Sequence, residues 1–198
     1  MKLKDVSALL RSGRTIIISE GRDCQWIGDG SAAYPMYGLP AMKKENLPVL
    51  LDIPESKQDS YTIQNTVLPF SEDDNTLNEY EITDLKTDIN YRGVTLSVFV
   101  GSGRLFFVKP KYLKPLGDMP DRRYFARISN GTYAIAVKEG FFLRAVIMPF
   151  VNIVDEDFVA VMKTIYSLSA DILISNKEEL EKQEEQASVM NMTEIEEE

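Results

Sequence analysis

The segment Gly101-Ser102-Gly103-Arg104 is the first of three places where residue types and spacing could do chemistry. Closely spaced glycines before a basic residue are found in loops that bind phosphate groups. The third glycine of a nucleotide-binding fingerprint is missing here, and the apolar residues that follow predict a strand rather than a helix. We therefore expect a β-hairpin turn at this position.

The second place is a set of carboxylates of the kind that bind Mg²⁺ in metal-dependent nucleases. Pro120-Asp121 resembles one half of that pattern, and Glu55-Ser56-Lys57 and Asp84-Leu85-Lys86 each resemble the other half. Both of these precede Pro120-Asp121, which is the wrong order, and all three lie in expected turns or linkers. Solvated turn charges are the better interpretation, and we expect no catalytic residue and no metal site.

The third place is the stretch from Arg104 to Arg144, where nine basic residues stand against three acidic ones and eight aromatic residues are interleaved. Aromatic and basic side chains together can stack on bases and neutralise phosphates. Alternating strands could equally place the aromatic residues in the core and the basic ones on the surface. The basic residues that cluster most closely are Lys109, Lys111 and Lys114 on one short helix, with Arg122, Arg123 and Arg127 nearby in sequence.

The chain contains no histidine, and this excludes several classes of enzyme. Ser-His-Asp and Cys-His nucleophilic sites cannot be built, nor can zinc or iron sites that use imidazole ligands. The single cysteine, Cys24, cannot form an intrachain disulfide, and its apolar neighbours predict a small buried hydrophobic residue. We expect a protein of a reducing cytoplasm that is not an enzyme and needs no cofactor.

Composition and charge describe a globular protein with an acidic end. Of 198 residues, 44% are hydrophobic and 27% charged, and the apolar runs near 141–151 and 158–174 are interrupted by polar residues before they could span a bilayer. The net charge is −9, of which residues 177–198 contribute −7. A second acidic stretch at 71–90 predicts a solvated linker or crossover.

The elements that must position these residues follow from periodicity and turn signals. Apolar residues at helical spacing predict a helix over 3–11 that stops at Ser12-Gly13. Strands are expected at 15–19, 25–27, 31–36 and 60–68, with a second helix over 42–51 that Pro48 weakens. Further strands are expected at 94–100, 104–108, 124–128, 133–137 and 141–149, and one or two helical turns over 110–116.

A long helix is expected to begin near 155, because its apolar residues keep helical spacing as far as Leu173. This stripe must be buried against the protein's own sheet or against another chain, and we favour the protein's own sheet. Burial against a second copy of the chain, in a homo-oligomer, is the alternative.

These elements predict an α+β fold with antiparallel sheets and a C-terminal helix. Residues 3–37 and 110–149 each predict a short helix followed by a three-stranded meander, which suggests a repeated unit, although chance similarity is an open alternative. The expected organisation is an N-terminal unit over 1–70, an acidic linker or crossover over 71–90, a β-rich unit over 91–153, a helix over 154–176 and an acidic tail over 177–198.

Two parts of the chain resemble DNA sliding clamps of the bacterial polymerase-processivity type. The run 111–116 (Lys-Tyr-Leu-Lys-Pro-Leu), the strand at 124–128 and the run 143–149 (Leu-Arg-Ala-Val-Ile-Met-Pro) are similar to the family's closing section, in which a Tyr-Leu helix precedes a final strand that ends in Met-Pro. The helix over 3–11, the paired strands and Gly28-Asp29-Gly30 are similar to the family's opening.

The resemblance implies a DNA-clamp-like fold, in which helices line a basic surface over DNA and the sheets lie outside. It places the phosphate contacts at Lys109, Lys111 and Lys114, and with less support at Lys2, Lys4, Arg11, Lys43 and Lys44, while the basic cluster adds Arg122 and Arg123. A partner groove is expected near Met148, Pro149 and Phe150. The chain has room for about one and a half clamp domains and continues past the Met-Pro strand, so ring closure is not implied.

The sequence therefore predicts a non-enzymatic, clamp-like processivity factor that binds double-stranded DNA without sequence preference and docks proteins of DNA replication or repair. A phage or mobile element is one source that fits such a protein. The alternative is a small regulatory or protein-protein interaction module with no role on nucleic acid. Neither function involves a membrane.

Overall fold

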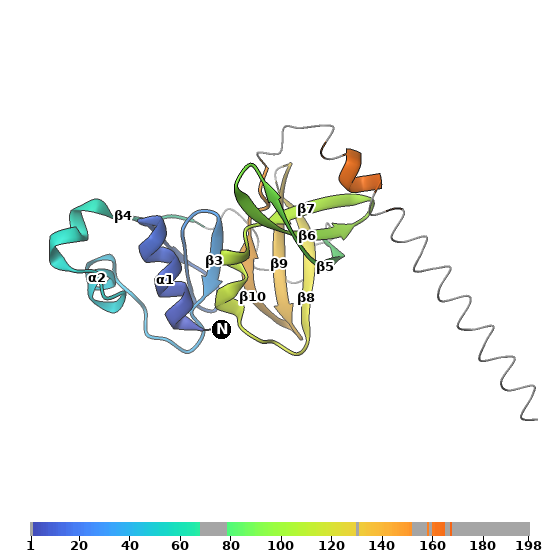
Figure 1. Cartoon of the computed structure of the whole chain (residues 1–198). Coiled ribbons are helices and arrows are strands. Elements are labelled where there is room, and N and C mark those ends of the chain that lie inside the picture. The colour runs from blue at the N-terminus through green and yellow to red at the C-terminus, as the bar shows by residue number, and fades with distance from the viewer. Residues whose placement is uncertain are drawn as a thin grey trace, which may run out of the picture. The chain divides into compact units, whose positions relative to one another are not determined.

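The computed structural model describes residues 2–67, 79–129, 131–151, 158, 160–164 and 167. Met1–Val151 form one compact unit and Asn152–Glu198 a second. The described strands of the first unit form a single ten-stranded sheet in which most neighbours run antiparallel (Figure 1). With its few helices, this unit has the α+β architecture that the sequence predicts.

The sheet joins strands from both halves of the first unit in the order β4-β1-β2-β3-β10-β9-β8-β5-β6-β7. Among the described strands, only β4 pairs in parallel, with β1, and β3 pairs with β10 through Ala33 opposite Val146. The strands are β1 (Thr15–Glu20), β2 (Gln25–Gly28), β3 (Ala32–Pro35), β4 (Thr62–Asn65), β5 (Glu79–Tyr91), β6 (Val94–Gly101), β7 (Arg104–Val108), β8 (Arg122–Ser129), β9 (Thr132–Glu139) and β10 (Phe142–Ile147).

The longest helix of the first unit is α1 (Leu3–Gly13), and it forms because its apolar residues recur at helical spacing. Val6, Leu9 and Leu10 are buried on one side of it. The helix includes the expected stop at Ser12-Gly13 and is capped by Arg14, whose left-handed backbone lets its N–H donate to the carbonyl of Leu10.

The remaining helical elements are short, and several contain or follow a proline. They are η1 (Lys44–Asn46), α2 (Leu47–Leu50), η2 (Glu55–Ser60), η3 (Pro110–Tyr112) and η4 (Lys114–Leu116). The helix expected over 42–51 is thus a 3₁₀ turn followed by one α-helical turn. Proline is tolerated in a first helical turn but not in an interior, and α2 begins at Leu47 with Pro48 in its first turn.

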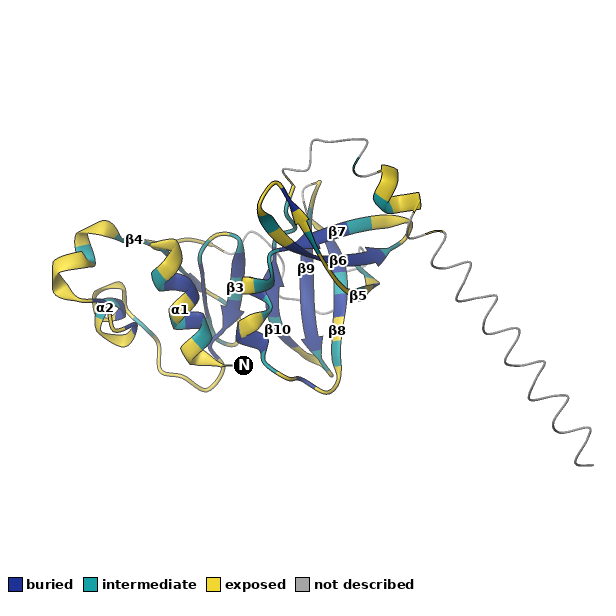
Figure 2. Cartoon of the chain, viewed as in Figure 1, coloured by how far each residue is buried: buried dark blue, intermediate teal, exposed yellow. Residues whose placement is uncertain are grey.

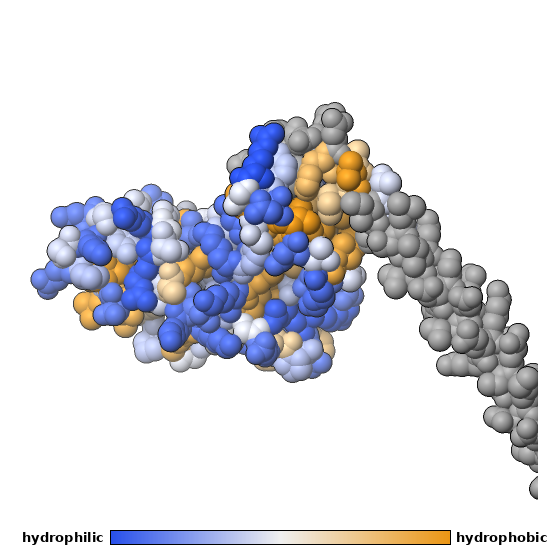
Figure 3. Space-filling view, viewed as in Figure 1, coloured by the Kyte–Doolittle hydropathy of each residue, from blue (hydrophilic) through white to orange (hydrophobic). Residues whose placement is uncertain are grey.

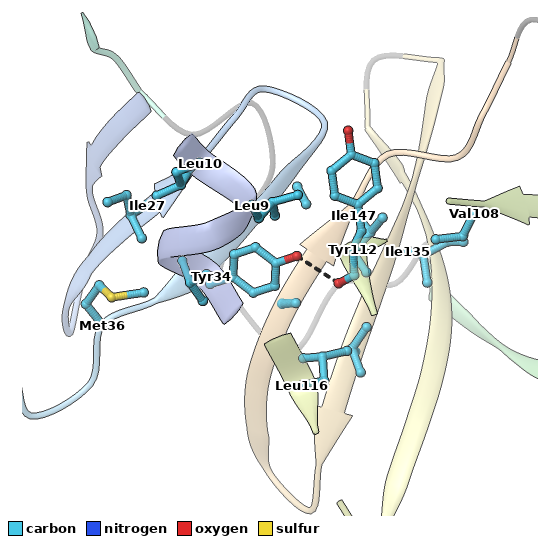
Figure 4. Close-up of a cluster of buried hydrophobic side chains, with 14 of the residues drawn as sticks. Leu9, Leu10, Ile27, Tyr34, Met36, Val108, Tyr112, Leu116, Ile135 and Ile147 are labelled. Carbon is cyan, nitrogen blue, oxygen red and sulfur yellow. Dashed lines mark hydrogen bonds between the residues drawn. The ribbon is translucent and has the colours of Figure 1, made fainter. Parts of the chain in front are cut away.

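The main core lies on one face of the sheet, and alternation along the strands decides which residues reach it. On β1, Ile16 and Ile18 enter this core, whereas Ile17 and Ser19 border a hollow. On β9, Ile135 enters the main core, while Ala134 and Ala136 pack in a second cluster with Trp26. Figure 2 shows the buried strands, and Figure 4 shows core residues from both halves of the unit.

Strand β5 begins within the stretch 71–90, which the sequence predicts to be an acidic linker or crossover, and ends at Tyr91. It pairs with β8 through its first half and with β6 through its second half, with an irregularity between Asp84 and Asp88. The acidic residues predicted solvent exposure, but a strand tolerates carboxylates along its exposed side when alternate positions such as Ile82 are buried. Residues 71–78 lie outside the described residues.

Cys24 is half-buried rather than buried, and it packs against the edge of the Trp26 cluster. It stands just before β2, where the chain is still at the surface.

In the second unit, residues 158, 160–164 and 167 are helical, as the apolar spacing predicts. The hydroxyl of Thr164 donates to the carbonyl of Ala160 over 3.0 Å, and Val161 is exposed. The rest of the expected helix and the acidic tail lie outside the described residues. No helix in the described part of the chain has the length and hydropathy needed to cross a membrane.

Candidate nucleic-acid interface

The helix α1 and the turns η3 and η4 lie side by side next to β3 and β10, and together with Lys2 and Lys109 they are called the helical layer here (Figure 1). The backbone N–H of Lys2 donates to the carbonyl of Pro115 over 2.7 Å. A further link comes from Tyr34 of β3, whose buried hydroxyl donates to the carbonyl of Tyr112 over 2.7 Å (Figure 4). Burial raises the pKa of the Tyr34 phenol, which keeps it a neutral donor.

Gly117 allows the N-terminus of α1 to approach η4 closely. It ends η4 with φ of 63° and ψ of −153°, a conformation that is nearly restricted to glycine. A Cβ atom at this position would lie 2.8 Å from the Cε of Lys2. The lysine stem therefore lies over the glycine, which brings Lys2 next to η4 although the two are more than a hundred residues apart in sequence.

Four lysines of the helical layer are exposed: Lys2, Lys4, Lys111 and Lys114. Within α1, η3 and η4 the only acidic residue is Asp5, which lies 3.8 Å from the Nζ of Lys114. The side chain of Lys114 is 73% exposed, so an ion pair at this distance contributes little and leaves most of the positive charge available to a ligand. Figure 3 shows this side of the molecule as mostly hydrophilic.

Two other predicted phosphate contacts in the layer are partly engaged within the protein. The ammonium group of Lys109 lies 5.2 Å from the ring centroid of Phe150, and this residue is half-buried. Arg11 lies 3.6 Å from the carboxylate of Asp52. Both are half-buried and have a partner within the protein, so they are less available to a ligand than the four exposed lysines.

The predicted arginine contacts on β8 lie outside the helical layer and are used internally. Arg122 donates to the carbonyl of Gly117 and to the hydroxyl of Tyr124. Arg123 makes two hydrogen bonds to the carboxylate of Glu81, and these lower the pKa of Glu81 and raise that of Arg123. The arginines hold η4 and β5 against β8.

Arg127, which the sequence also grouped with the positive cluster, belongs to a buried ionic group. Its Nε lies 2.5 Å from one carboxylate oxygen of Glu79, and Lys138 lies 2.7 Å from the other. Lys138 also stands 4.7 Å from the ring centroid of Phe125. Nothing in the sequence around Glu79 marks it as a partner of these cations, because the three residues come from different strands.

Lys43 and Lys44 are exposed at the start of η1, outside the helical layer. They follow Met42, whose backbone N–H and carbonyl are bound by the side-chain amide of Gln25 on β2. They therefore belong to a different part of the surface.

The expected partner groove near Met148 coincides with a hollow of about 240 Å³ on the other face of the sheet. Met148 lines it together with Trp26 and Val146, whereas Pro149 and Phe150 do not. The backbone N–H of Phe150 donates to the carbonyl of Phe107 on β7, which takes the chain away from the hollow. Ile17 and Ser19 of β1 also line this hollow, on the face of the sheet opposite the main core.

Comparisons of the chain with models of protein families, with curated protein sequences and with solved structures find no match.

Proposed function

We propose that this protein binds double-stranded DNA through the helical layer, as a non-enzymatic, clamp-like protein of replication or repair. The observation that carries the proposal is the contact between the start of α1 and η4, which gathers Lys2, Lys4, Lys111 and Lys114 on one exposed layer. Lysine is suited to phosphate contacts that carry no sequence information. The resemblance to sliding clamps supports the same assignment of helices to the DNA side.

The charge distribution supports a local rather than a global attraction to DNA. The chain carries a net charge of −9, so a duplex is repelled by the molecule as a whole and attracted only near the lysines. Binding of this kind is weak at physiological salt and depends steeply on ionic strength, because each neutralised phosphate releases counterions. A tethering function needs such contacts to be weak enough for the protein to move along DNA.

In the proposed function, a partner protein docks at the hollow near Met148. Trp26 and Val146 give this hollow apolar walls, and it lies on the face of the sheet opposite the main core. A protein bound there would leave the lysines of the helical layer accessible to DNA.

The test is a duplex-binding titration at several salt concentrations with the triple variant Lys4→Gln/Lys111→Gln/Lys114→Gln. Two 30-base-pair duplexes of unrelated sequence are used, and fluorescence anisotropy gives the affinity. We expect equal affinity for both duplexes in the unchanged protein. The triple variant should lose up to about 2 to 3 units of the slope of log affinity against log salt concentration.

The matched control is Lys57→Gln/Arg92→Gln/Lys163→Gln, which removes the same charge from exposed positions outside the helical layer. Equal losses in the two triple variants would mean that overall charge, and not this layer, governs binding. Absence of duplex binding by the unchanged protein at about 50 mM salt, where phosphate contacts are strong, would refute the proposal.

The second candidate function is an interaction module with no role on nucleic acid. It is favoured by the apolar hollow near Met148 and by the internal use of Arg122, Arg123 and Arg127. A protein that fails to bind duplex DNA but loses binding of a partner protein on Met148→Glu substitution would fit this function instead.

A further inference from the structure

A second and larger groove lies between α1 and the segment 36–51, away from the hollow near Met148. Its volume is about 600 Å³, in the range of sites that bind ligands or peptide side chains. The walls are apolar: Leu3 and Val6 come from α1, Met36 and Met42 from the segment, and Ile27 from β2. Methionine side chains adapt their shape easily, and they are common where a surface receives apolar groups of a partner.

Several apolar side chains at the edge of this groove are exposed to solvent. Val49 and Leu50 on α2 are 80% and 59% exposed, and Leu39 is 42% exposed. Figure 3 shows hydrophobic residues at the surface around α2. All three line the groove, and so does Leu3, which is also exposed. Grouped apolar exposure of this kind marks an interaction site, whereas single exposed apolar residues are ordinary.

The charges at the edge indicate what kind of partner fits. Leu3 stands between Lys2 and Lys4, and Met42 is followed directly by Lys43 and Lys44; all four lysines are exposed. No acidic residue lines the groove, and the carboxylates that adjoin these lysines in sequence are Asp5, next to Lys4, and Glu45, next to Lys44. A partner segment with apolar side chains for the groove and carboxylates for its border is complementary to this surface.

We propose that the groove between α1 and segment 36–51 binds an acidic amphipathic segment of a partner protein. Apolar side chains of that segment enter between α1 and α2, and its carboxylates meet Lys43 and Lys44. This occupant differs from DNA in needing apolar side chains, and the groove differs in position from the hollow near Met148. The proposal therefore stands whether or not the protein binds DNA.

The experiment uses three synthetic 16-residue peptides and the full-length protein. The Leu/Glu peptide has leucine on one helical face and glutamate elsewhere, the Leu/Lys peptide replaces each glutamate with lysine, and the Gln/Glu peptide replaces each leucine with glutamine. We expect the Leu/Glu peptide to bind at least about 10-fold more tightly than either of the others. Calorimetry or anisotropy measures the affinities.

Two variants assign the binding to this groove. Val49→Asp/Leu50→Asp should lower the affinity for the Leu/Glu peptide by about 10-fold or more, because the variant removes apolar contacts and adds charge of the same sign as the peptide's. Lys43→Glu/Lys44→Glu should lower the affinity for the Leu/Glu peptide and raise the affinity for the Leu/Lys peptide. All four side chains are exposed, so the fold should be retained.

The matched control is Phe141→Asp/Val151→Asp, which places two carboxylates on exposed apolar positions that do not line the groove. It should leave the affinity of the Leu/Glu peptide within about twofold. The proposal is overturned if the Leu/Glu peptide shows no saturable binding, if the Leu/Lys peptide binds equally well, or if the control and the groove variants weaken binding alike. Duplex binding by Val49→Asp/Leu50→Asp should be unchanged, which separates this test from that of the helical layer.

Discussion

A side chain at Gly28 would collide with the backbone of the neighbouring strand. A Cβ atom there would overlap the carbonyl oxygen of Ala32, where the turn brings β2 and β3 together. Asp29 completes the turn, since its carboxylate accepts the backbone N–H groups of Ser31 and Ala32. The glycine is therefore required by close approach of two backbones.

We expect Gly28→Ala to lower the free energy of unfolding by about 2 to 4 kcal/mol, because the backbone must shift to admit the methyl group. Chemical denaturation monitored by circular dichroism measures the change. The matched control is Gly13→Ala at the end of α1, where an added Cβ meets only ordinary contacts with Asp29. That substitution should be neutral or stabilise by up to about 1 kcal/mol. A similar loss in both variants would contradict the explanation.

The hydroxyl of Tyr34 makes a buried hydrogen bond between β3 and η3. Tyr34→Phe removes the donor and leaves the carbonyl of Tyr112 without that bond, so we expect a loss of about 1 to 2 kcal/mol in the free energy of unfolding. Tyr61→Phe is the control, because its hydroxyl bonds the carbonyl of Arg11 at a half-buried site over 3.2 Å. A loss for Tyr61→Phe as large as that for Tyr34→Phe would show that burial does not set the cost.

At the scale of elements, the buried group of Glu79, Arg127 and Lys138 links β5, β8 and β9. Its three side chains are at most 11% exposed, and one carboxylate accepts bonds from both cations. We expect Glu79→Gln to lower the free energy of unfolding by about 3 kcal/mol, because two buried cations lose the negative charge of the carboxylate that they share. Denaturant unfolding measures this. Glu81→Gln, two residues along β5 at a half-exposed site, should cost less than about 1 kcal/mol.

Glu81 on the same strand predicts how the stability of the protein changes at low pH. Hydrogen bonds from Arg123 lower the pKa of Glu81 below its ordinary value of 4.5. A carboxylate whose pKa is lowered by folding stabilises the protein above that ordinary value, and the stabilisation is lost as the pH falls through the lowered pKa. The stability difference between the unchanged protein and Glu81→Gln should therefore be constant near neutral pH and vanish in acid. A difference that grows as the pH falls would contradict this sign.

At the scale of the first unit, the main core and the sheet join residues that lie far apart in the sequence. The main core holds Leu10 of α1 together with Ile135 of β9, and β3 pairs directly with β10. The sequence predicts separate units before residue 70 and after residue 91. In the structure both contribute to one compact unit over Met1–Val151.

We therefore expect one cooperative thermal transition for this unit. The chain has a single tryptophan, Trp26, on β2, where it packs with Leu143 and Val146 of β10. Its fluorescence should change at the same temperature as the far-ultraviolet circular dichroism of the strands. Two separated transitions, with tryptophan fluorescence following only the first, would mean that the halves fold independently.

Local patterns were enough to predict most of the individual elements. The helix at the N-terminus follows from the spacing of Val6, Leu9 and Leu10, and the hairpins follow from glycine turns between apolar runs. Such signals depend on side chains only a few residues apart, so they survive without any knowledge of the rest of the chain. The mixed α+β class followed from the same signals.

Tertiary structure alone decided which of the charged residues share a surface. Lys2 meets η4 because β3 pairs with β10 and Gly117 permits a close approach. Arg123 and Arg127 follow the lysine cluster closely in sequence, but they are bound by carboxylates of β5. The acidic composition of that strand predicted a linker, because charge reports exposure and not backbone pairing. Pairing between distant strands depends on complementary edges and a shared core, and these are properties of the whole chain rather than of any local window.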